Sequence, residues 1–276
     1  MSDAASVFFT PRLPELALAN AEAYQAAEPY PHIAIHDFLD REAAEEARRQ
    51  FPRPDDISWH IADHTNAVKR YQFDERFMPP AILDLCRAFN SSRFVLFLEH
   101  LTGIDSLIPD PHLVGGGMHQ VGRGGHLGLH ADFNWHHKLQ LHRRLNALIY
   151  LSPDWDDSWG GALEFWRVGD DEATDSVMPQ FNTLAVFTTG SESAHGNPVP
   201  VACPEGVYRQ ALNFYYYTSA PAPGPTNEPH WTRYLEEDER GLPAQFVQAP
   251  DPRAVSASAF AVALREDFLA EADEPG

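Results

Sequence analysis

The chain has 276 residues, of which 43% are hydrophobic and 12% aromatic, a composition typical of one large globular domain that excludes general disorder. Its 40 acidic and 20 basic residues give a formal net charge of −20, which opposes binding to nucleic-acid backbones and to anionic membrane surfaces. The two cysteines exclude a disulfide framework, and no apolar run is long enough to cross a bilayer. Together with the lack of a readable secretory signal, these features predict a cytoplasmic protein.

The first part of the chain, residues 1–108, has the patterns of supporting helices with lead-in strands. Asp40 is a suitable N-cap for a helix in which acidic residues come early and arginines late, as the helix dipole favours. Further along, apolar residues recur at helical spacing until Thr102 and Gly103 end the pattern. We therefore expect helices over residues 15–27, 41–49 and 80–101, the last of them divided at 90–92.

From about residue 112 the pattern changes to short apolar or alternating runs, separated by Gly, Pro, Asp and Ser. Such runs are typical of strands in an antiparallel sandwich or barrel. The strands are expected at 127–133, 145–151, 162–166, 183–188 and 208–218. A Pro/Gly-rich stretch after Pro221 ends this unit, and one more amphipathic helix is expected at about 254–272.

These patterns predict an α+β fold with helices first and strands second. Residues 1–108 would form the support, residues 109–220 the sheet core, and residues 221–276 an extension packed on that core. We expect the three parts to make one compact domain.

Histidine is concentrated in one segment of the sheet region, where seven of the 14 histidines lie close together. They are His112, His119, His126, His130, His136, His137 and His142. Alternation along a strand places His130 and Asp132 on one face, about 7 Å apart, where both side chains can reach one metal ion. His126 lies about 13 Å from His130 along an extended strand, too far to share that ion without a bend.

A second imidazole is available downstream, because His195 follows the expected strand at 183–188. Two histidines and one carboxylate on strands match the facial triad that binds non-haem iron(II) and leaves coordination positions open. Arg209 begins an apolar, aromatic strand, where an unpaired guanidinium would be costly. We expect it to receive a carboxylate ligand, with an ion pair to one of the acidic residues of the chain as the alternative.

The stretch from about 109 to 218 resembles the prolyl-4-hydroxylase-like branch of the iron(II)/2-oxoglutarate-dependent dioxygenases. The resemblance depends on six segments that follow one another in order and at similar spacing. They are 115–120, 130–134, 143–151, 160–166, 195–198 and 209–216. The family has a double-stranded β-helix (jelly-roll) core with supporting N-terminal helices, and the resemblance implies the same fold here.

The resemblance also implies a role for each site residue. Arg209 would bind the distal carboxylate of the co-substrate 2-oxoglutarate. Tyr150 matches a position whose hydroxyl joins that contact, and Leu163 matches an apolar wall of the same pocket. L-ascorbate is suggested as an additional cofactor. The ligands of Fe(2+) would be His130, Asp132 and His195.

The activity implied by the resemblance is hydroxylation of an unactivated carbon by dioxygen, with decarboxylation of 2-oxoglutarate to succinate. Asp132 stands where halogenating relatives have a small residue, which favours hydroxylation. The expected substrate is a prolyl or similar residue in a peptide or protein, with a free amino acid or other small metabolite as the alternative.

Two other classes of protein remain open. A cupin-like metal-binding protein would have the same barrel and triad without 2-oxoglutarate chemistry, but it would have no use for Arg209. A zinc hydrolase would use His126 with His130 and Asp132, but the strand spacing is unfavourable for that set.

The remaining charged residues of the histidine-rich segment are expected to form a basic patch on a solvated loop, with a substrate rim as the alternative. This patch comprises His136, His137, Lys138, His142, Arg143 and Arg144. His119 and Gln120 are expected on a strand that precedes the triad and faces the site. The two lysines, Lys69 and Lys138, are expected to lie away from the co-substrate, and residues 198–206 to form an inserted loop at the rim.

Overall fold

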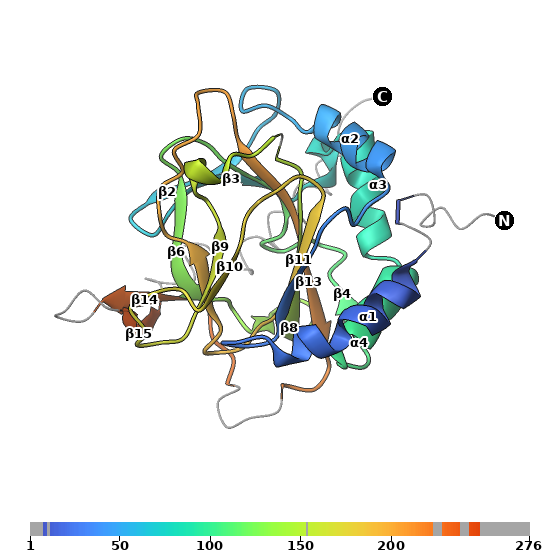
Figure 1. Ribbon diagram of the computed structural model, residues 1–276, viewed down its shortest axis with the longest axis vertical. Coiled ribbons are helices and arrows are strands. Elements are labelled where there is room, and N and C mark those ends of the chain that lie inside the picture. Colours follow the sequence, from blue (N-terminus) through green and yellow to red (C-terminus); the bar gives the residue numbers. More distant parts are fainter. Residues whose placement is uncertain (1–7, 10–11, 153, 223–227, 238–242, 249–276) are drawn as a thin grey trace, which may run out of the picture.

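The computed structural model of the chain describes residues 8–9, 12–152, 154–222, 228–237 and 243–248. Its strands form an antiparallel sheet that curls into a nearly closed barrel, and its helices gather on one side of that barrel (Figure 1). The expected double-stranded β-helix core with supporting helices is confirmed. None of the helices in the described ranges is long and apolar enough to span a bilayer.

The described residues contain four α-helices: α1 (Leu13–Ala26), α2 (Arg41–Gln50), α3 (Pro80–Phe89) and α4 (Ser92–Thr102). Local side chains fix their ends. Asp40 accepts hydrogen bonds from the backbone N–H groups of Glu42 and Ala43, at 3.0 and 3.1 Å. Ser91 caps α4, which Gly103 ends in the left-handed conformation with a φ of 71°. The predicted break within 80–101 therefore separates α3 from α4.

Strands run through the whole described chain and alternate with helices in its first half. The N-terminal half of the series is β1 (His32–Ile35), β2 (His60–His64), β3 (Ala67–Gln72), β4 (Ile108–Pro109), β5 (Gly117–Val121), β6 (His126–Ala131) and β7 (Trp135–His136). The remaining strands are β8 (Leu141–Tyr150), β9 (Leu163–Trp166), β10 (Asp175–Val177), β11 (Thr183–Thr188), β12 (Ala194–Asn197), β13 (Arg209–Thr218), β14 (Arg233–Glu237) and β15 (Pro243–Gln248). The helix expected at 254–272 lies outside the described residues.

The sheet interleaves strands from distant parts of the chain. Its main path has the order β1-β11-β8-β13-β5-β3-β6-β12-β9-β10, and β14 adds to β6. Strand β1 therefore pairs with β11, and β3 lies between β5 and β6. Lead-in strands were expected within residues 1–108, but a strict order of helices first and strands second does not hold, because β1 and β3 pair with partners far along the chain and belong to the same sheet.

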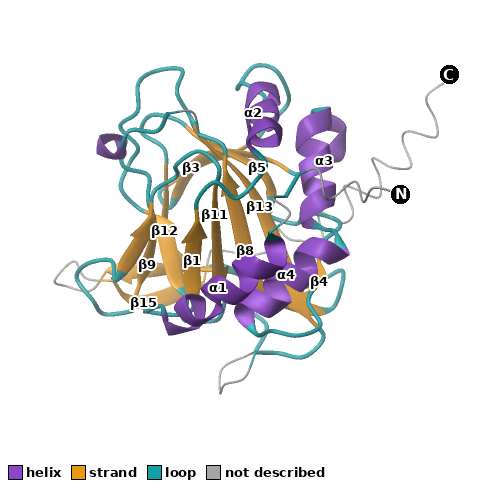
Figure 2. Cartoon of the chain, turned by 45° about the vertical axis from the view of Figure 1, so that its right-hand side comes forward, coloured by secondary structure: helices purple, strands orange, loops and turns teal. Residues whose placement is uncertain are grey.

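The two faces of the central strands β8, β11 and β13 bury different cores, as alternation along a strand requires. One face packs against the helices, as Figure 2 shows. It includes Leu145, Ala147, Ile149, Leu184, Val186, Leu212 and Phe214. The other face lines the inside of the barrel with Leu148, Tyr150, Ala185, Phe187 and Ala211. The inner face is the one on which a ligand site can form.

Asn182 joins the segment after β1 to the start of β11. Its side chain accepts from the Leu39 backbone N–H at 2.9 Å and donates to the Leu39 carbonyl at 3.0 Å. Asn182 also has a φ of 58°, which asparagine adopts more readily than alanine. Asn182→Ala should therefore lower the free energy of unfolding by about 2–5 kcal/mol, measured by urea denaturation. Gln140, which has a φ of 57° but is exposed, gives the control Gln140→Ala, and an equal loss there would contradict the role of the buried hydrogen bonds.

Candidate active site

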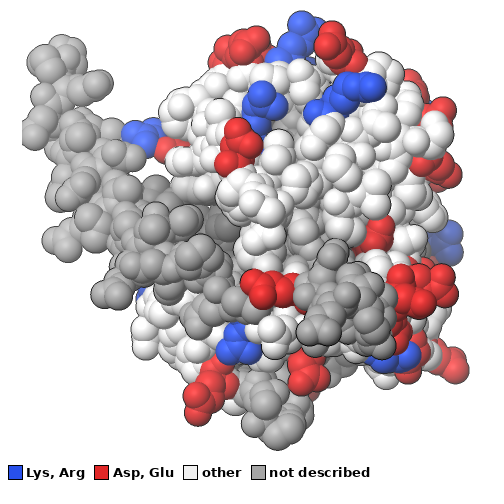
Figure 3. Space-filling model, turned by 90° about the vertical axis from the view of Figure 1, so that its left-hand side faces the viewer, with Lys and Arg blue, Asp and Glu red and all other residues white. Residues whose placement is uncertain are grey.

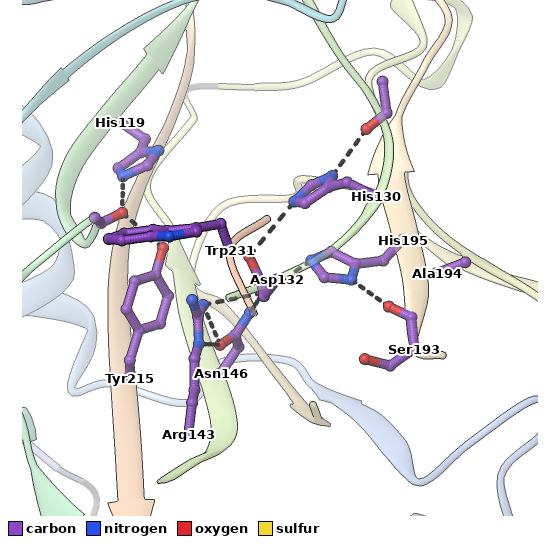
Figure 4. Close-up of polar contacts among 12 residues, drawn as sticks. His119, His130, Asp132, Arg143, Asn146, Ser193, Ala194, His195, Tyr215 and Trp231 are labelled. Atoms are coloured by element: carbon purple, nitrogen blue, oxygen red, sulfur yellow. Dashed lines mark hydrogen bonds and ion pairs between the residues drawn. The ribbon is translucent and has the colours of Figure 1, made fainter. Parts of the chain in front are cut away.

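Three buried side chains with metal-ligating atoms meet where β6 and β12 lie side by side (Figure 4). His130 on β6 is directly opposite His195 on β12, and their ring centroids are 4.4 Å apart. Asp132 follows the last residue of β6. One ligand atom from each of the three lies within 4.8 Å of the others, and no other group of three such residues in the described ranges meets this condition.

Backbone carbonyls fix the orientation of both imidazoles. His130 Nδ1 lies 2.8 Å from the carbonyl oxygen of Gly128, and His195 Nδ1 lies 2.9 Å from that of Ser193. Because a carbonyl can only accept, each Nδ1 carries the proton and donates it. Each Nε2 therefore presents a lone pair towards Asp132, which is the arrangement that outer hydrogen-bond partners impose on metal-ligating histidines.

The Asp132 carboxylate is held by two partners besides the histidines. Its Oδ2 atom accepts from Asn146 Nδ2 at 2.8 Å and lies 3.0 Å from the Arg143 guanidinium. Burial alone would raise the pKa of Asp132, but the charge of Arg143, together with the two neighbouring imidazoles, outweighs it and holds this pKa well below its ordinary value. The carboxylate is therefore ionised at neutral pH.

The donor set fits a divalent transition-metal ion. Asp132 Oδ2 is 3.2 Å from His195 Nε2, and Asp132 Oδ1 is 3.5 Å from His130 Nε2. Burial, with the nearby His195, lowers the pKa of His130, so that this imidazole is neutral at neutral pH. A neutral imidazole places its lone pair facing a carboxylate, an arrangement that a cation between them stabilises. Two imidazole nitrogens and one carboxylate are the ligands of the facial triad of non-haem iron.

Arg209 lies on the inner face of β13 and is buried. Its Nε donates to the Gly161 carbonyl at 2.8 Å, and Nη2 donates to the Tyr150 hydroxyl at 3.0 Å. Gly161 has a φ of 77°, and a Cβ there would lie 3.3 Å from Arg209 Cδ, so that this position suits glycine alone. Among the described residues no carboxylate lies within ion-pair distance of Arg209, and the internal pair considered as an alternative does not form there.

One cavity of about 280 Å³ connects these groups. The triad, Arg209 and Leu163 line it. Tyr150 takes part through its hydrogen bond to Arg209 rather than by lining the cavity itself. His119 also lines the cavity, whereas its neighbour Gln120 points the other way and donates to the Pro52 carbonyl. Of these two neighbours, only His119 faces the site.

The expected basic patch does not form as a unit, because Arg143 and His136 are buried. Strict alternation would place Arg143 and Asn146 on opposite faces of β8. A register shift between β8 and β13 at this point puts both side chains beside Asp132. The guanidinium of Arg143 also lies 3.4 Å above the ring of Tyr215. A bulge of this kind leaves no signal in the sequence pattern.

Lys69 is a second residue whose position was predicted wrongly. It was expected away from the co-substrate, but it lies on β3 and lines the cavity together with Arg209. Strand β3 enters the barrel wall by pairing with β5 and β6. Nothing near Lys69 in the sequence indicates these two long-range pairings.

The expected loop at 198–206 is anchored to the turn between β5 and β6. The Val201 carbonyl accepts from the Gly124 N–H at 2.7 Å, and the Val201 N–H donates to the Gly125 carbonyl at 2.9 Å. Val201 and Cys203 are buried with Val121 and Trp155 in a small apolar cluster. The loop thus supports the outer side of the cavity wall, and none of its residues lines the cavity.

Comparison with known proteins adds a family to this geometry. Residues 116–217 match the family model of the 2OG-Fe(II) oxygenase superfamily. The matched range begins before β5 and ends within β13, and so includes the triad and Arg209. No curated protein sequence is significantly similar to the chain.

Solved structures share the fold at low sequence identity. A prolyl-4-hydroxylase from Pseudomonas putida is 17% identical with a TM-score of 0.50, and the match covers 73% of this chain and 98% of that one. A prolyl hydroxylase from Trichoplax adhaerens, solved in complex with a peptide fragment of the hypoxia inducible factor oxygen degradation domain, is 16% identical with a TM-score of 0.50. That match covers 75% of this chain and 90% of that one.

Proposed function

The chain belongs to the 2OG-Fe(II) oxygenase superfamily and is a 2-oxoglutarate-dependent dioxygenase, and from this premise we propose that it hydroxylates an unactivated carbon atom. The observation that carries the proposal is the meeting of His130, Asp132 and His195 in a cavity that also contains Arg209. Membership of this superfamily removes the zinc-hydrolase and cupin-like alternatives.

In this proposal each group of the site has one task. His130, Asp132 and His195 hold iron(II), with Nε2 of each imidazole turned towards the metal by its backbone carbonyl. Arg209 receives the distal carboxylate of 2-oxoglutarate, and Leu163 provides an apolar wall beside it. The Tyr150 hydroxyl, whose pKa is raised by burial, stays protonated beside Arg209 and can donate to the same carboxylate.

Iron(II) together with 2-oxoglutarate supplies the activation of dioxygen and the removal of hydrogen from the substrate carbon. The chain positions the metal, the co-substrate and the substrate, and it excludes water from them. The triad side chains are buried, and Phe187 and Leu148 add apolar walls to the cavity. L-ascorbate, as a reductant that keeps the metal as iron(II), is part of the proposal on the strength of the sequence resemblance.

The primary substrate is proposed at the level of a class. The sequence resemblance favours a prolyl or similar residue in a peptide or protein. The cavity, of about 280 Å³, has room for the alternative, a free amino acid or other small metabolite. In both cases the hydroxylated carbon would have to reach the triad through this cavity.

The proposed function is tested without knowledge of the substrate. Iron(II) is added to metal-free protein under anaerobic conditions, followed by 2-oxoglutarate, and the visible charge-transfer band of the chelate is recorded. We expect the band to form at about one equivalent of metal. Iron binding without a band would contradict 2-oxoglutarate chemistry in this protein.

Asn146 is expected to control how firmly the metal is held, since it donates to Asp132 and accepts from Arg143. Asn146→Ala should weaken iron(II) binding by roughly 10- to 100-fold, the usual effect of losing an outer partner of a metal ligand. Calorimetric titration measures the affinity. Asn90→Ala, at the end of α3, is the control and should leave it unchanged; equal affinity in the two variants would remove Asn146 from this role.

A further inference from the structure

The cavity contains a lysine that the proposed function does not use. Lys69 Nζ lies 3.4 Å from His119 Nδ1. His119 Nε2 lies 3.2 Å from the carbonyl oxygens of both Gly115 and Gly116, so Nε2 carries the proton and Nδ1 is free to accept. Burial, with the charge of Lys69, keeps the pKa of His119 well below its ordinary value. A neutral imidazole therefore accepts from the ammonium and positions it at the cavity wall.

Lys69 and Arg209 start from the same level of the sheet, on either side of β5. Arg209 of β13 pairs with Val121. Arg70 of β3 pairs with Gln120, which puts Lys69 level with Val121 on the other side. The two backbone positions are therefore two strand spacings apart, about 10 Å.

From these starting points the two charged groups lean in the same direction, each towards the next strand, and their contacts His119 and Tyr150 both lie level with Ala211, on either side of β13. Arg209 donates to the Gly161 carbonyl and to the Tyr150 hydroxyl, towards β8 and β9. Lys69 reaches along the cavity to His119, whose own partner on β13 is Ala211. The cavity thus offers two separate positions for an anion, and a single carboxylate bound at Arg209 does not satisfy both cations.

The charge of the cavity is unbalanced. Asp132 is the acidic residue in its wall, and Asp132 is already paired with Arg143. In the described part of the chain, no carboxylate lies within ion-pair distance of Lys69. Burial lowers the pKa of Lys69 to about 8, with Arg209 and Arg143 adding to the effect and Asp132 opposing it. The ammonium is still largely charged at neutral pH, and an anion beside it would stabilise that charge.

The chain as a whole has the opposite charge. On the face that carries β2, β6 and the β14–β15 hairpin, acidic and basic side chains both lie around the margin, and few charged groups lie in the part that is visible between them (Figure 3). With a net charge of −20, the chain repels anions at long range. A buried cation in a protein of this charge therefore does not serve to attract anions from a distance, and we expect it to contact an anion inside the cavity.

We propose that Lys69, positioned by His119, binds a carboxylate of the primary substrate, which makes that substrate a small carboxylic acid of the size of a free amino acid. The inference rests on the proposed function, because it requires Arg209 to be occupied by 2-oxoglutarate. A single ammonium suits a monoanion, whereas a phosphate dianion is usually met by several donors or by an arginine fork. Tyr71, Ala62 and Tyr234 line the same cavity and offer contact surface for a small side chain.

The test measures binding rather than turnover. The protein is loaded with zinc and saturating 2-oxoglutarate. Free L-amino acids and N-acetyl-L-proline are then titrated into it, and their binding is measured by saturation-transfer NMR. Each acid is compared with its carboxamide at equal ionic strength. We expect at least one acid to bind wild-type protein at least tenfold more tightly than its amide does. Lys69→Gln should weaken that acid by roughly 10- to 100-fold, as loss of a charge-assisted hydrogen bond predicts. Lys138→Gln, at the exposed second lysine, should leave it unchanged.

Several results would overturn the inference. With wild-type protein alone, the inference fails if acids and their amides bind equally or if no acid of the panel binds. It also fails if the best ligand is N-acetyl-L-prolinamide, which mimics a prolyl residue in the interior of a peptide. Undiminished acid binding by Lys69→Gln overturns it as well. If Lys69→Gln loses 2-oxoglutarate affinity to the same degree as Arg209→Gln, the lysine belongs to the co-substrate. Failure of the proposed function gives a different result, which is no 2-oxoglutarate binding by metal-loaded wild-type protein.

Discussion

Replacement of Asp132 by alanine is expected to abolish metal-dependent turnover of 2-oxoglutarate. It should weaken iron(II) binding by more than the roughly 10- to 100-fold that loss of an outer partner costs. Asp132 is the one anionic member of the triad, and its two oxygens face His195 and His130 at 3.2 and 3.5 Å. Two imidazoles alone are a weak set for a divalent ion that prefers mixed nitrogen and oxygen ligands. Calorimetry measures the metal affinity, and succinate formation measures turnover.

The same substitution removes the carboxylate that pairs with buried Arg143, and this costs stability by about 3–5 kcal/mol. Asp132→Asn, which keeps the volume and one oxygen, separates loss of the metal ligand from loss of packing. Asp84→Ala, at an exposed aspartate of α3, controls for removal of a carboxylate as such. Full turnover by Asp132→Ala, with iron and without added halide, would remove Asp132 from the triad.

Replacement of Arg209 by glutamine is expected to raise the concentration of 2-oxoglutarate needed for half-saturation by about 30-fold or more. The estimate corresponds to about 2 kcal/mol or more for truncating one partner of a buried, hydrogen-bonded charge pair. Iron(II) affinity should stay the same, because Arg209 contacts Gly161 and Tyr150 rather than the triad. The charge-transfer band, titrated with 2-oxoglutarate at saturating iron(II), measures the effect.

The matched control for Arg209→Gln is Arg123→Gln, since Arg123 is exposed and donates to backbone carbonyls of the 198–206 loop. That variant should bind 2-oxoglutarate like the wild type. A parallel fall in iron(II) affinity in Arg209→Gln would indicate a general disturbance of the site. Unchanged dependence on 2-oxoglutarate would show that another cation receives the distal carboxylate.

The features predicted correctly from the sequence depend on residues that are close in the chain. Asp40 caps α2 through N–H groups two and three residues away, and residues 90–92 divide α3 from α4 as expected, so that the local sequence locates these helix ends. The strand at Thr183–Thr188 was predicted to the residue, because an unbroken apolar run lies between polar turns. His130 and His195 were recognised individually, but only the pairing of β6 with β12 brings them to opposite positions.

The features that were missed depend on pairings between distant segments. Lys69 lies in a short polar strand, and its place at the cavity follows from partners some 50 residues later on β5 and β6. Arg143 was grouped with neighbouring histidines as a solvated patch, because no sequence pattern marks the register shift that turns it inward. In both cases the residue can be read from the sequence, but the contact that brings it to the cavity cannot.

The pairing of β1 with β11 also determines when the protein can fold during synthesis. His32 lies opposite Phe187, so that the first strand leaves the ribosome about 150 residues before its partner. At the usual translation rate of about 5–20 residues per second, Ile33 and Ile35 remain without their partner strand for roughly 8 to 30 seconds. The apolar sides of the helices stay uncovered for longer still, because the face of β8, β11 and β13 that covers them is complete only when β13 (Arg209–Thr218) has been made. The N-terminal support and the barrel are therefore completed together, late in translation, and not one after the other.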